Sequence, residues 1–132
     1  MSTDSLGDRM KKNYEDRYRI YLTRRTPVIL RLDGKGFSKL TKGCKRPFDT
    51  DFHTCMFCTT MVLCYEIQGA KFAYQQSDEI SILITDFDNI NTDAWFNYNL
   101  QKMVSSWMSN IFMNSACFST SIGLKVYMMI YL

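Results

Sequence analysis

Blocks of apolar residues along the chain alternate between two spacings, and each block predicts one element of secondary structure. Short runs of β-prone residues predict strands, and apolar residues that recur every three or four positions predict helices. In chain order, the expected elements are a helix over residues 6–19, a strand over 28–32, a helix over 51–68, strands over 70–76 and 80–85, a helix from about 92 to 111 and a strand over 125–132. A short polar turn joins the second and third strands, which therefore form a hairpin.

This order of elements predicts the α+β class. Strand, helix, strand, strand, helix and strand in succession are typical of the ferredoxin-like βαββαβ arrangement, an antiparallel sheet with two helices on one face, here preceded by an N-terminal helix. A right-handed crossover makes the first two strands parallel, and the hairpin returns the third strand antiparallel beside the first. The chain has 132 residues, a length that suits one domain.

The first predicted strand ends in residues that suit a ligand better than a core. Asp33 ends the strand, and Gly34 and Gly36 then allow the backbone to approach a ligand closely. In the predicted topology this end of the strand lies next to the hairpin turn, so Asp33 and Asp78 meet, with Glu79 adjacent. Carboxylates beside a glycine backbone suit Mg²⁺, and two such ions support in-line phosphoryl transfer. An ordinary solvated turn remains the alternative, because Ser and Asp are common in turns.

Basic residues follow the Asp33 loop, at positions that would neutralise a triphosphate. They are Lys35, Lys39, Lys45 and Arg46. The net charge of +3 and the pI of about 8.6 are compatible with a nucleic-acid partner. No Walker A pattern is present, which excludes a P-loop enzyme. The charged helix over residues 6–19 has two interpretations: a solvated face with ion pairs, or a basic arm that contacts phosphates and extends to Arg24 and Arg25.

The cysteines predict packing rather than a metal site. Their number, five, is odd, and they lie in apolar segments, which is typical of reduced thiols in the cytoplasm. Cys55 and Cys58 have CxxC spacing, but zinc requires four ligands and His53 is the only histidine. The sequence has neither an apolar run of membrane-spanning length nor a signal-peptide pattern, so we expect a cytoplasmic protein without a membrane partner.

Several motifs resemble the tRNA-His guanylyltransferase family. They are Arg31–Phe37, Arg46–Asp49, Gln68–Lys71 and Gln76–Ser81, and Leu6–Lys11 and Asp93–Phe96 resemble most its guanylyltransferase-like branch, the 3′–5′ polymerases. The resemblance implies a palm domain, with residues 1–27 as an N-terminal helical arm and 28–132 as the catalytic domain. It also implies a nucleotidyltransferase that extends the 5′ end of tRNA in the 3′–5′ direction, for tRNA-His guanylylation or repair of 5′-truncated tRNA.

The resemblance also implies roles for individual residues. Asp33 and Asp78 would bind two Mg²⁺ ions together with the carbonyl of Gly34, and Glu79 would support catalysis. The residues that would hold the nucleotide substrate, GTP or ATP, are Asp33, Gly34, Lys35, Gly36, Phe37, Ser38, Arg46, Ser77 and Asp78. The expected partners are tRNA, nucleoside triphosphates and further copies of the chain, because family members assemble as tetramers.

The chain departs from the family pattern in two places. Ser38 stands where the family commonly has His. Family chains also continue for about another domain half, with a His-Ile-Asn-Asn segment, and residues 119–132 do not match them well, so we expect a C-terminally truncated chain with weak or no activity. Two alternatives stay open: a nucleotidyl cyclase on the same scaffold, and an inactive RNA-binding fragment.

Overall fold

The computed structural model describes residues 5–34, 36–106 and 126–131. Its elements are the helical segments α1 (Leu6–Met10), η1 (Lys11–Glu15) and η2 (Asp16–Tyr18), strand β1 (Val28–Gly34), helices α2 (Phe37–Leu40), η3 (Thr41–Gly43) and α3 (Thr50–Glu66), strands β2 (Ala70–Gln76) and β3 (Glu79–Ile84), the turn η4 (Trp95–Tyr98) and strand β4 (Val126–Tyr131). Residues 100–106 are also helical. The predicted ferredoxin-like arrangement is confirmed.

The four strands form an antiparallel sheet in the order β2-β3-β1-β4. β1 is central, because it pairs with β3 on one side and with β4 on the other. Since β2 and β1 are both antiparallel to β3, they are parallel to each other, as the crossover rule requires. The end of β1 therefore lies beside the β2–β3 hairpin turn, the juxtaposition on which the candidate site depends.

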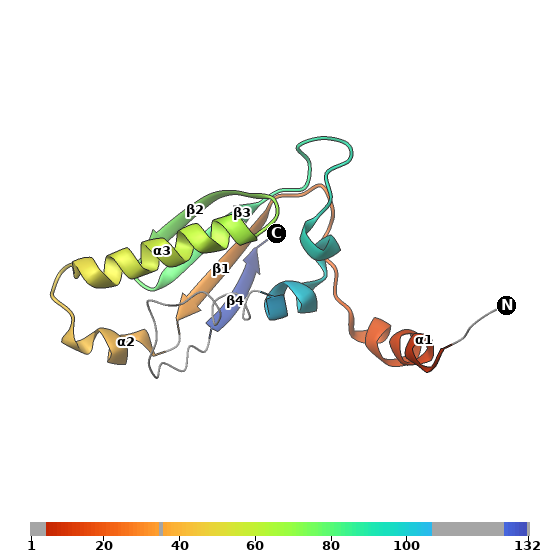
Figure 1. Cartoon of the computed structure of the whole chain (residues 1–132), viewed down its shortest axis with the longest axis horizontal. Helices are drawn as coiled ribbons and strands as arrows, with labels where there is room; N and C mark the ends of the chain where they lie inside the picture. Colours follow the sequence, from red (N-terminus) through yellow and green to blue (C-terminus); the bar gives the residue numbers. More distant parts are fainter. Residues whose placement is uncertain (1–4, 35, 107–125, 132) are drawn as a thin grey trace.

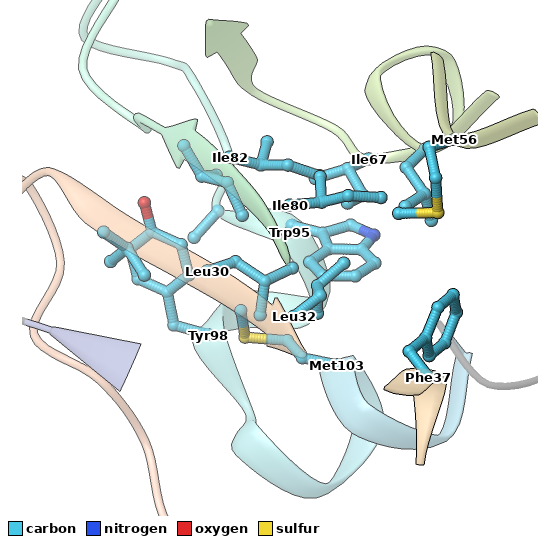
Figure 2. Close-up of a cluster of buried hydrophobic side chains, with 14 residues drawn as sticks. Leu30, Leu32, Phe37, Met56, Ile67, Ile80, Ile82, Trp95, Tyr98 and Met103 are labelled. Atoms are coloured by element: carbon cyan, nitrogen blue, oxygen red, sulfur yellow. The ribbon is translucent and has the colours of Figure 1, made fainter. Parts of the chain in front are cut away.

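The core lies on one face of the sheet, where α3 (Figure 1) and the segment of residues 94–103 pack against the strands. Alternate β1 residues Val28, Leu30 and Leu32 are buried, whereas the residues between them are partly or fully exposed, so β1 has one core face and one open face. Figure 2 shows Trp95, Tyr98 and the β-strand residues in one cluster. The buried apolar residues are Val28, Leu30, Leu32, Phe37, Met56, Leu63, Ile67, Ile80, Ile82, Ile84, Ala94, Trp95, Tyr98 and Met103.

The helix expected from about residue 92 begins later than the sequence predicts, at residue 100. Instead of a cap near residue 92, a tight turn over Trp95–Tyr98 precedes the helix, and Phe96 and Asn97 have φ of 48° and 53°. The cap is Asn99, whose Oδ1 accepts a hydrogen bond from the backbone N–H of Lys102 at 3.0 Å. The turn buries Trp95 and leaves Phe96 42% exposed, so Phe96 does not join the apolar side of the helix, although its spacing from Leu100 would place it there.

The N-terminal helical segment is exposed and carries ion pairs within itself, as the first of its two interpretations predicts. Arg19 forms ion pairs with Glu15 and Asp16 on its own helical segment, at 3.0 and 2.7 Å. For Arg24 and Arg25 the structure favours internal contacts over the alternative of a phosphate-binding arm, because both guanidinium groups bind within the chain. Arg24 Nε and the backbone N–H of Arg25 donate to the buried carboxylate of Asp86 at 2.7 and 2.8 Å.

Two further expectations have outcomes in the described part of the chain. The four cysteines described there, at positions 44, 55, 58 and 64, are free thiols, and Cys55 and Cys58 lie on α3. Over the same residues, no helix combines the length and apolar character needed to cross a bilayer.

Candidate functional site

Asp33 lies directly opposite Glu79 in the β1–β3 ladder. Glu79 is also the partner of Gln76 across the hairpin, so only Ser77 and Asp78 form the turn. Residues opposite each other on antiparallel strands have Cβ atoms about 5 Å apart. The structure therefore brings Asp33 together with Asp78 and Glu79, which are distant from it in sequence, at one corner of the sheet, here called the carboxylate corner.

The three carboxylates differ in their contacts. Glu79 forms an ion pair with Arg31 on the same sheet face, and both side chains are about one-third exposed. Asp33 is exposed and Asp78 half-buried, and neither forms a hydrogen bond or ion pair with another described residue. Glu79 is thus held by a counter-charge, whereas Asp33 and Asp78 offer their oxygens to a ligand.

These two carboxylates fit a hard cation better than a soft one. Mg²⁺ binds through one or two carboxylates, substrate phosphates and water, so two aspartates with a nearby backbone carbonyl form an adequate donor set. Within the described residues, no group of three or more His, Cys, Asp or Glu side chains forms a metal cage. The arrangement suits an ion that arrives with a phosphate ligand, and it does not suit a structural zinc site.

The loop after β1 has a glycine where the backbone requires one. Gly36 has φ of +80°, a conformation that side chains disfavour, and it leads into α2. Phe37 is buried and its ring packs edge-on against Phe52, with 6.0 Å between ring centroids. A ligand at Phe37 would therefore meet the backbone rather than the ring. Ser38 is exposed, and Lys35 lies outside the described residues.

A pocket of about 610 Å³ opens between the loop before α3 and the hairpin turn. Its lining residues are Thr41, Cys44, Lys45, Arg46, Pro47, Asp49, Phe52 and Ser77. It joins two predicted site residues, Arg46 and Ser77, whose separation in sequence gave no indication of contact. The neighbour of Ser77 in the turn is Asp78, so the pocket reaches the carboxylate corner from the basic side.

Asp49 fixes the basic wall of this pocket. Its carboxylate accepts hydrogen bonds from the backbone N–H of Phe52 at 3.0 Å, which caps α3, and of Lys45 at 2.9 Å. These bonds, with that from Phe52 the larger influence, hold the pKa of Asp49 below its ordinary value. An aspartate before a helix is typical of a cap, but the bond of Asp49 to Lys45 has no local signal in the sequence, because it depends on how the preceding loop turns.

Ser77 has φ of +55°, an unusual conformation for a residue with a side chain. Two-residue hairpins require positive φ at their first turn position, which glycine normally supplies. Retaining a serine there costs roughly 1–3 kcal/mol, and such strain is concentrated at functional sites. Ser77 lines the pocket in this conformation.

Comparisons with known proteins connect this geometry to a family. A family model described as Thg1, tRNAHis guanylyltransferase, matches residues 7–126. A curated relative, the uncharacterised protein R259 of Acanthamoeba polyphaga mimivirus, is 32% identical over 108 residues, which cover 77% of this chain and 36% of the relative.

Solved structures give the same result. A bacterial tRNA(His) guanylyltransferase (Thg1)-like protein in complex with ATP is 42% identical, with a TM-score of 0.81 over 98% of this chain and 58% of that one. The corresponding complex with GTP is 44% identical, with a TM-score of 0.82 over 97% and 59%.

The tRNA(His) guanylyltransferase from Saccharomyces cerevisiae is 20% identical with a TM-score of 0.60 over 96% and 56%, a likeness that concerns the fold alone. The chain thus spans less than two thirds of the length of the relatives it matches. Because the family model covers almost all of its residues, the chain belongs to the tRNAHis guanylyltransferase family.

Proposed function

We propose that this chain carries the catalytic site of a nucleotidyltransferase that adds nucleotides to the 5′ end of tRNA in the 3′–5′ direction. The observation that carries the proposal is that the pocket adjoins the carboxylate corner. Ser77 lines the pocket, and the next residue in the chain is Asp78. Family membership supports nucleotidyl transfer, and the bacterial relatives hold ATP and GTP.

The pocket suits the triphosphate of an incoming nucleotide. Arg46 and Lys45 provide positive charge on one side, and the hydroxyl and backbone of Ser77 provide hydrogen bonds on the other. A volume of about 610 Å³ lies within the range of nucleotide-sized ligand sites, about 300–1,000 Å³. A nucleotide bound in this way has its phosphates next to Asp78.

Asp33 and Asp78, with the backbone carbonyl of Gly34, would hold two Mg²⁺ ions, and Glu79 would keep Arg31 in place beside them. When bound, the metal neutralises phosphate charge and activates the attacking hydroxyl. The chain aligns the 3′-hydroxyl of the incoming nucleotide with the activated 5′ phosphate of the RNA. The new O–P bond forms as the bond to the leaving group, pyrophosphate or AMP, breaks, and the proton of the hydroxyl passes to solvent.

The direct test of nucleotide binding is titration of the chain with GTP and Mg²⁺. We expect Arg46→Ala to weaken binding about tenfold, because hydrogen bonds between charged groups contribute about 1.5–3 kcal/mol. Lys42→Ala is the matched control, since Lys42 is an exposed cation of η3 that does not line the pocket. Equal affinities of the two variants would place the nucleotide elsewhere.

The test of catalysis is nucleotide addition to a 5′-truncated tRNA with Mg²⁺ and nucleoside triphosphates. Asp33→Ala and Asp78→Ala are each expected to lower the rate by at least about 100-fold, because mutation of outer-shell metal partners alone costs about 10–100-fold. Asp88→Ala is the control, since Asp88 forms a surface ion pair with Lys71. A cyclic nucleotide formed without RNA would support the cyclase alternative, and tRNA binding without turnover would support the inactive fragment.

A further inference from the structure

The open face of the sheet, opposite the core, carries exposed aromatic side chains in line with the carboxylate corner. Phe72 is 63% exposed and Tyr74 is 55% exposed, although both lie within β2. On the same strand, Ala73 and Gln75 point toward the covered face and are partly buried. Large exposed rings on a strand are poorly explained by folding, and such patches often mark a binding surface.

The strand register arranges this open face as three rows. The row nearest the site is Asp33, Glu79 and Gln76; the next is Arg31, Ser81 and Tyr74; the third is Ile29, Leu83 and Phe72. Successive rows are two residues apart along each strand, so they are separated by about 7 Å. A ligand that extends from the carboxylate corner along the sheet would meet Tyr74 first and Phe72 second.

The charge of this face permits an anionic ligand. Arg31 and Glu79 form an ion pair, so their charges cancel, and the row of Phe72 carries no charge. β4, at the opposite edge of the sheet from β2, contains no charged residue. Lys71 lies at the register shift in β2, next to Phe72 in sequence. It adds a cation there, which forms an ion pair with Asp88. Apart from Asp33 at the site end, the three rows leave no unpaired carboxylate to repel phosphates.

We infer that this face, through Tyr74 and Phe72, binds unpaired nucleotides of the RNA substrate by stacking. A four-stranded sheet with exposed aromatic residues on adjacent rows is a known means of stacking two or three splayed bases of single-stranded RNA. The inference rests on the proposed function, since it places the strand that leads into the active site. The other face of the sheet offers no such path, because α3 covers it (Figure 1) and its side chains are packed in the core.

The test is the affinity of the chain for a short fluorescein-labelled single-stranded RNA, measured by anisotropy beside a blunt duplex of the same sequence. We expect the single strand to bind more tightly, and Phe72→Ala and Tyr74→Ala each to weaken its binding about tenfold, the usual effect of losing one base–aromatic stack. Tyr74→Phe retains the ring and is expected to keep wild-type affinity.

Two aromatic residues on the outer side of α3 provide matched controls. Phe57 is 56% exposed and Tyr65 88% exposed, and both lie on the opposite side of the molecule from the open sheet face. Their alanine variants are expected to bind RNA as the wild type does. Equal losses in the α3 variants, unchanged affinity in Phe72→Ala and Tyr74→Ala, or no preference for the single strand would each overturn the inference.

Further outcomes separate this surface from the proposed function. If self-association measured by sedimentation falls in Phe72→Ala while RNA affinity is unchanged, the face joins copies of the chain, and the inference is wrong. If RNA binding depends on Phe72 and Tyr74 but no nucleotide is transferred, the surface stands and the proposed function fails. If nucleotide transfer is lost in Asp33→Ala but both Phe72→Ala and Tyr74→Ala bind RNA as the wild type does, the proposed function stands and the inference about this surface fails.

Discussion

Asp86→Asn is the substitution whose effect on the fold can be worked out most fully. Asp86 follows β3 and has a side chain with no exposed surface. Its Oδ2 accepts a hydrogen bond from Nε of Arg24 at 2.7 Å, and its Oδ1 accepts one from the backbone N–H of Arg25 at 2.8 Å. These bonds attach the segment before β1 to the end of β3. Asparagine has the same shape but places an NH₂ group against one of the two donors.

The expected cost is about 2–4 kcal/mol. Each hydrogen bond to a charged group contributes about 1.5–3 kcal/mol, and the amide keeps one acceptor but loses the charge. The partner Arg24 is 40% exposed and water can solvate it after the change, which limits the loss. Since domains of this size are stable by only about 5–15 kcal/mol, the effect is large and measurable.

The pH dependence provides a second signature. Burial by itself raises the pKa of Asp86, but the hydrogen bonds from Arg24 and Arg25 outweigh it and hold the pKa below its ordinary value. Below about pH 4 the unfolded chain therefore binds a proton that the folded chain still excludes, so this part of the stability is lost as the pH falls through the folded pKa. Asp86→Asn lacks this contribution and should lose less stability over the same interval.

Urea unfolding monitored by circular dichroism at neutral and acidic pH measures both effects. Asp88→Asn is the control, because Asp88 forms an exposed ion pair with Lys71, and such pairs contribute about 0–1 kcal/mol. A loss of less than about 0.5 kcal/mol for Asp86→Asn, or an acid dependence identical to that of the wild type, would refute the role assigned to this carboxylate.

Three other substitutions have definite expected outcomes. Gly69→Ala should lower the free energy of unfolding by about 2 kcal/mol or more, because φ is +85° and a Cβ would lie 2.4 Å from the carbonyl oxygen of Thr85, whereas Gly43→Ala meets no atom within 4 Å and serves as control. Tyr98→Phe should change the free energy of unfolding by no more than about 1 kcal/mol: burial and the neighbouring carboxylate of Asp86 raise the pKa of Tyr98 to about 12, so its hydroxyl stays protonated, but this hydroxyl makes no hydrogen bond of normal geometry with a described residue. Ser77→Gly should raise the free energy of unfolding by about 1 kcal/mol, because relief of the φ of +55°, which costs roughly 1–3 kcal/mol, is partly offset by the greater conformational entropy of glycine, and it should weaken GTP binding in calorimetry because the hydroxyl is lost; a destabilised variant with normal affinity would contradict both parts.

Much of the sheet could be predicted from the sequence because its signals are local. β1 shows apolar residues up to Leu32 and then Asp33, and the β2–β3 hairpin shows two strand patterns around a polar turn. Given the crossover rule, the meeting of Asp33 with the hairpin turn followed from topology. The two-residue turn fixes the pairing of β2 with β3, whereas the β1–β3 register, with Asp33 opposite Glu79, depends on packing between segments distant in sequence.

The start of the helix over residues 100–106 was harder to predict, because burial of Trp95 and Tyr98 competes with the local helical pattern. Phe96 and Leu100 have helical spacing, and Thr92 is a reasonable cap, so the local pattern favours an early helix. In the structure, burial of Trp95 and Tyr98 stabilises a left-handed turn, and the helix begins only at Asn99. Tertiary packing outweighed local propensity there.

Parts of the site could not be predicted because they depend on contacts between distant segments. The basic loop that contains Arg46 was recognised from its composition, but nothing local indicates that it faces Ser77. Likewise, Arg24 was a plausible phosphate ligand until its bond to the buried Asp86 was known. An arginine in sequence has no local signal that distinguishes a ligand contact from an internal ion pair.

The central claim is that Asp33 and Asp78 share divalent cations at the end of β1. Mn²⁺ suits the same carboxylate and phosphate ligands as Mg²⁺ and can be counted by electron paramagnetic resonance. In the presence of GTP, we predict Mn²⁺ binding to the wild-type chain that is lost in both Asp33→Asn and Asp78→Asn and retained in Asp88→Asn. Wild-type Mn²⁺ binding in the first two variants would contradict the claim.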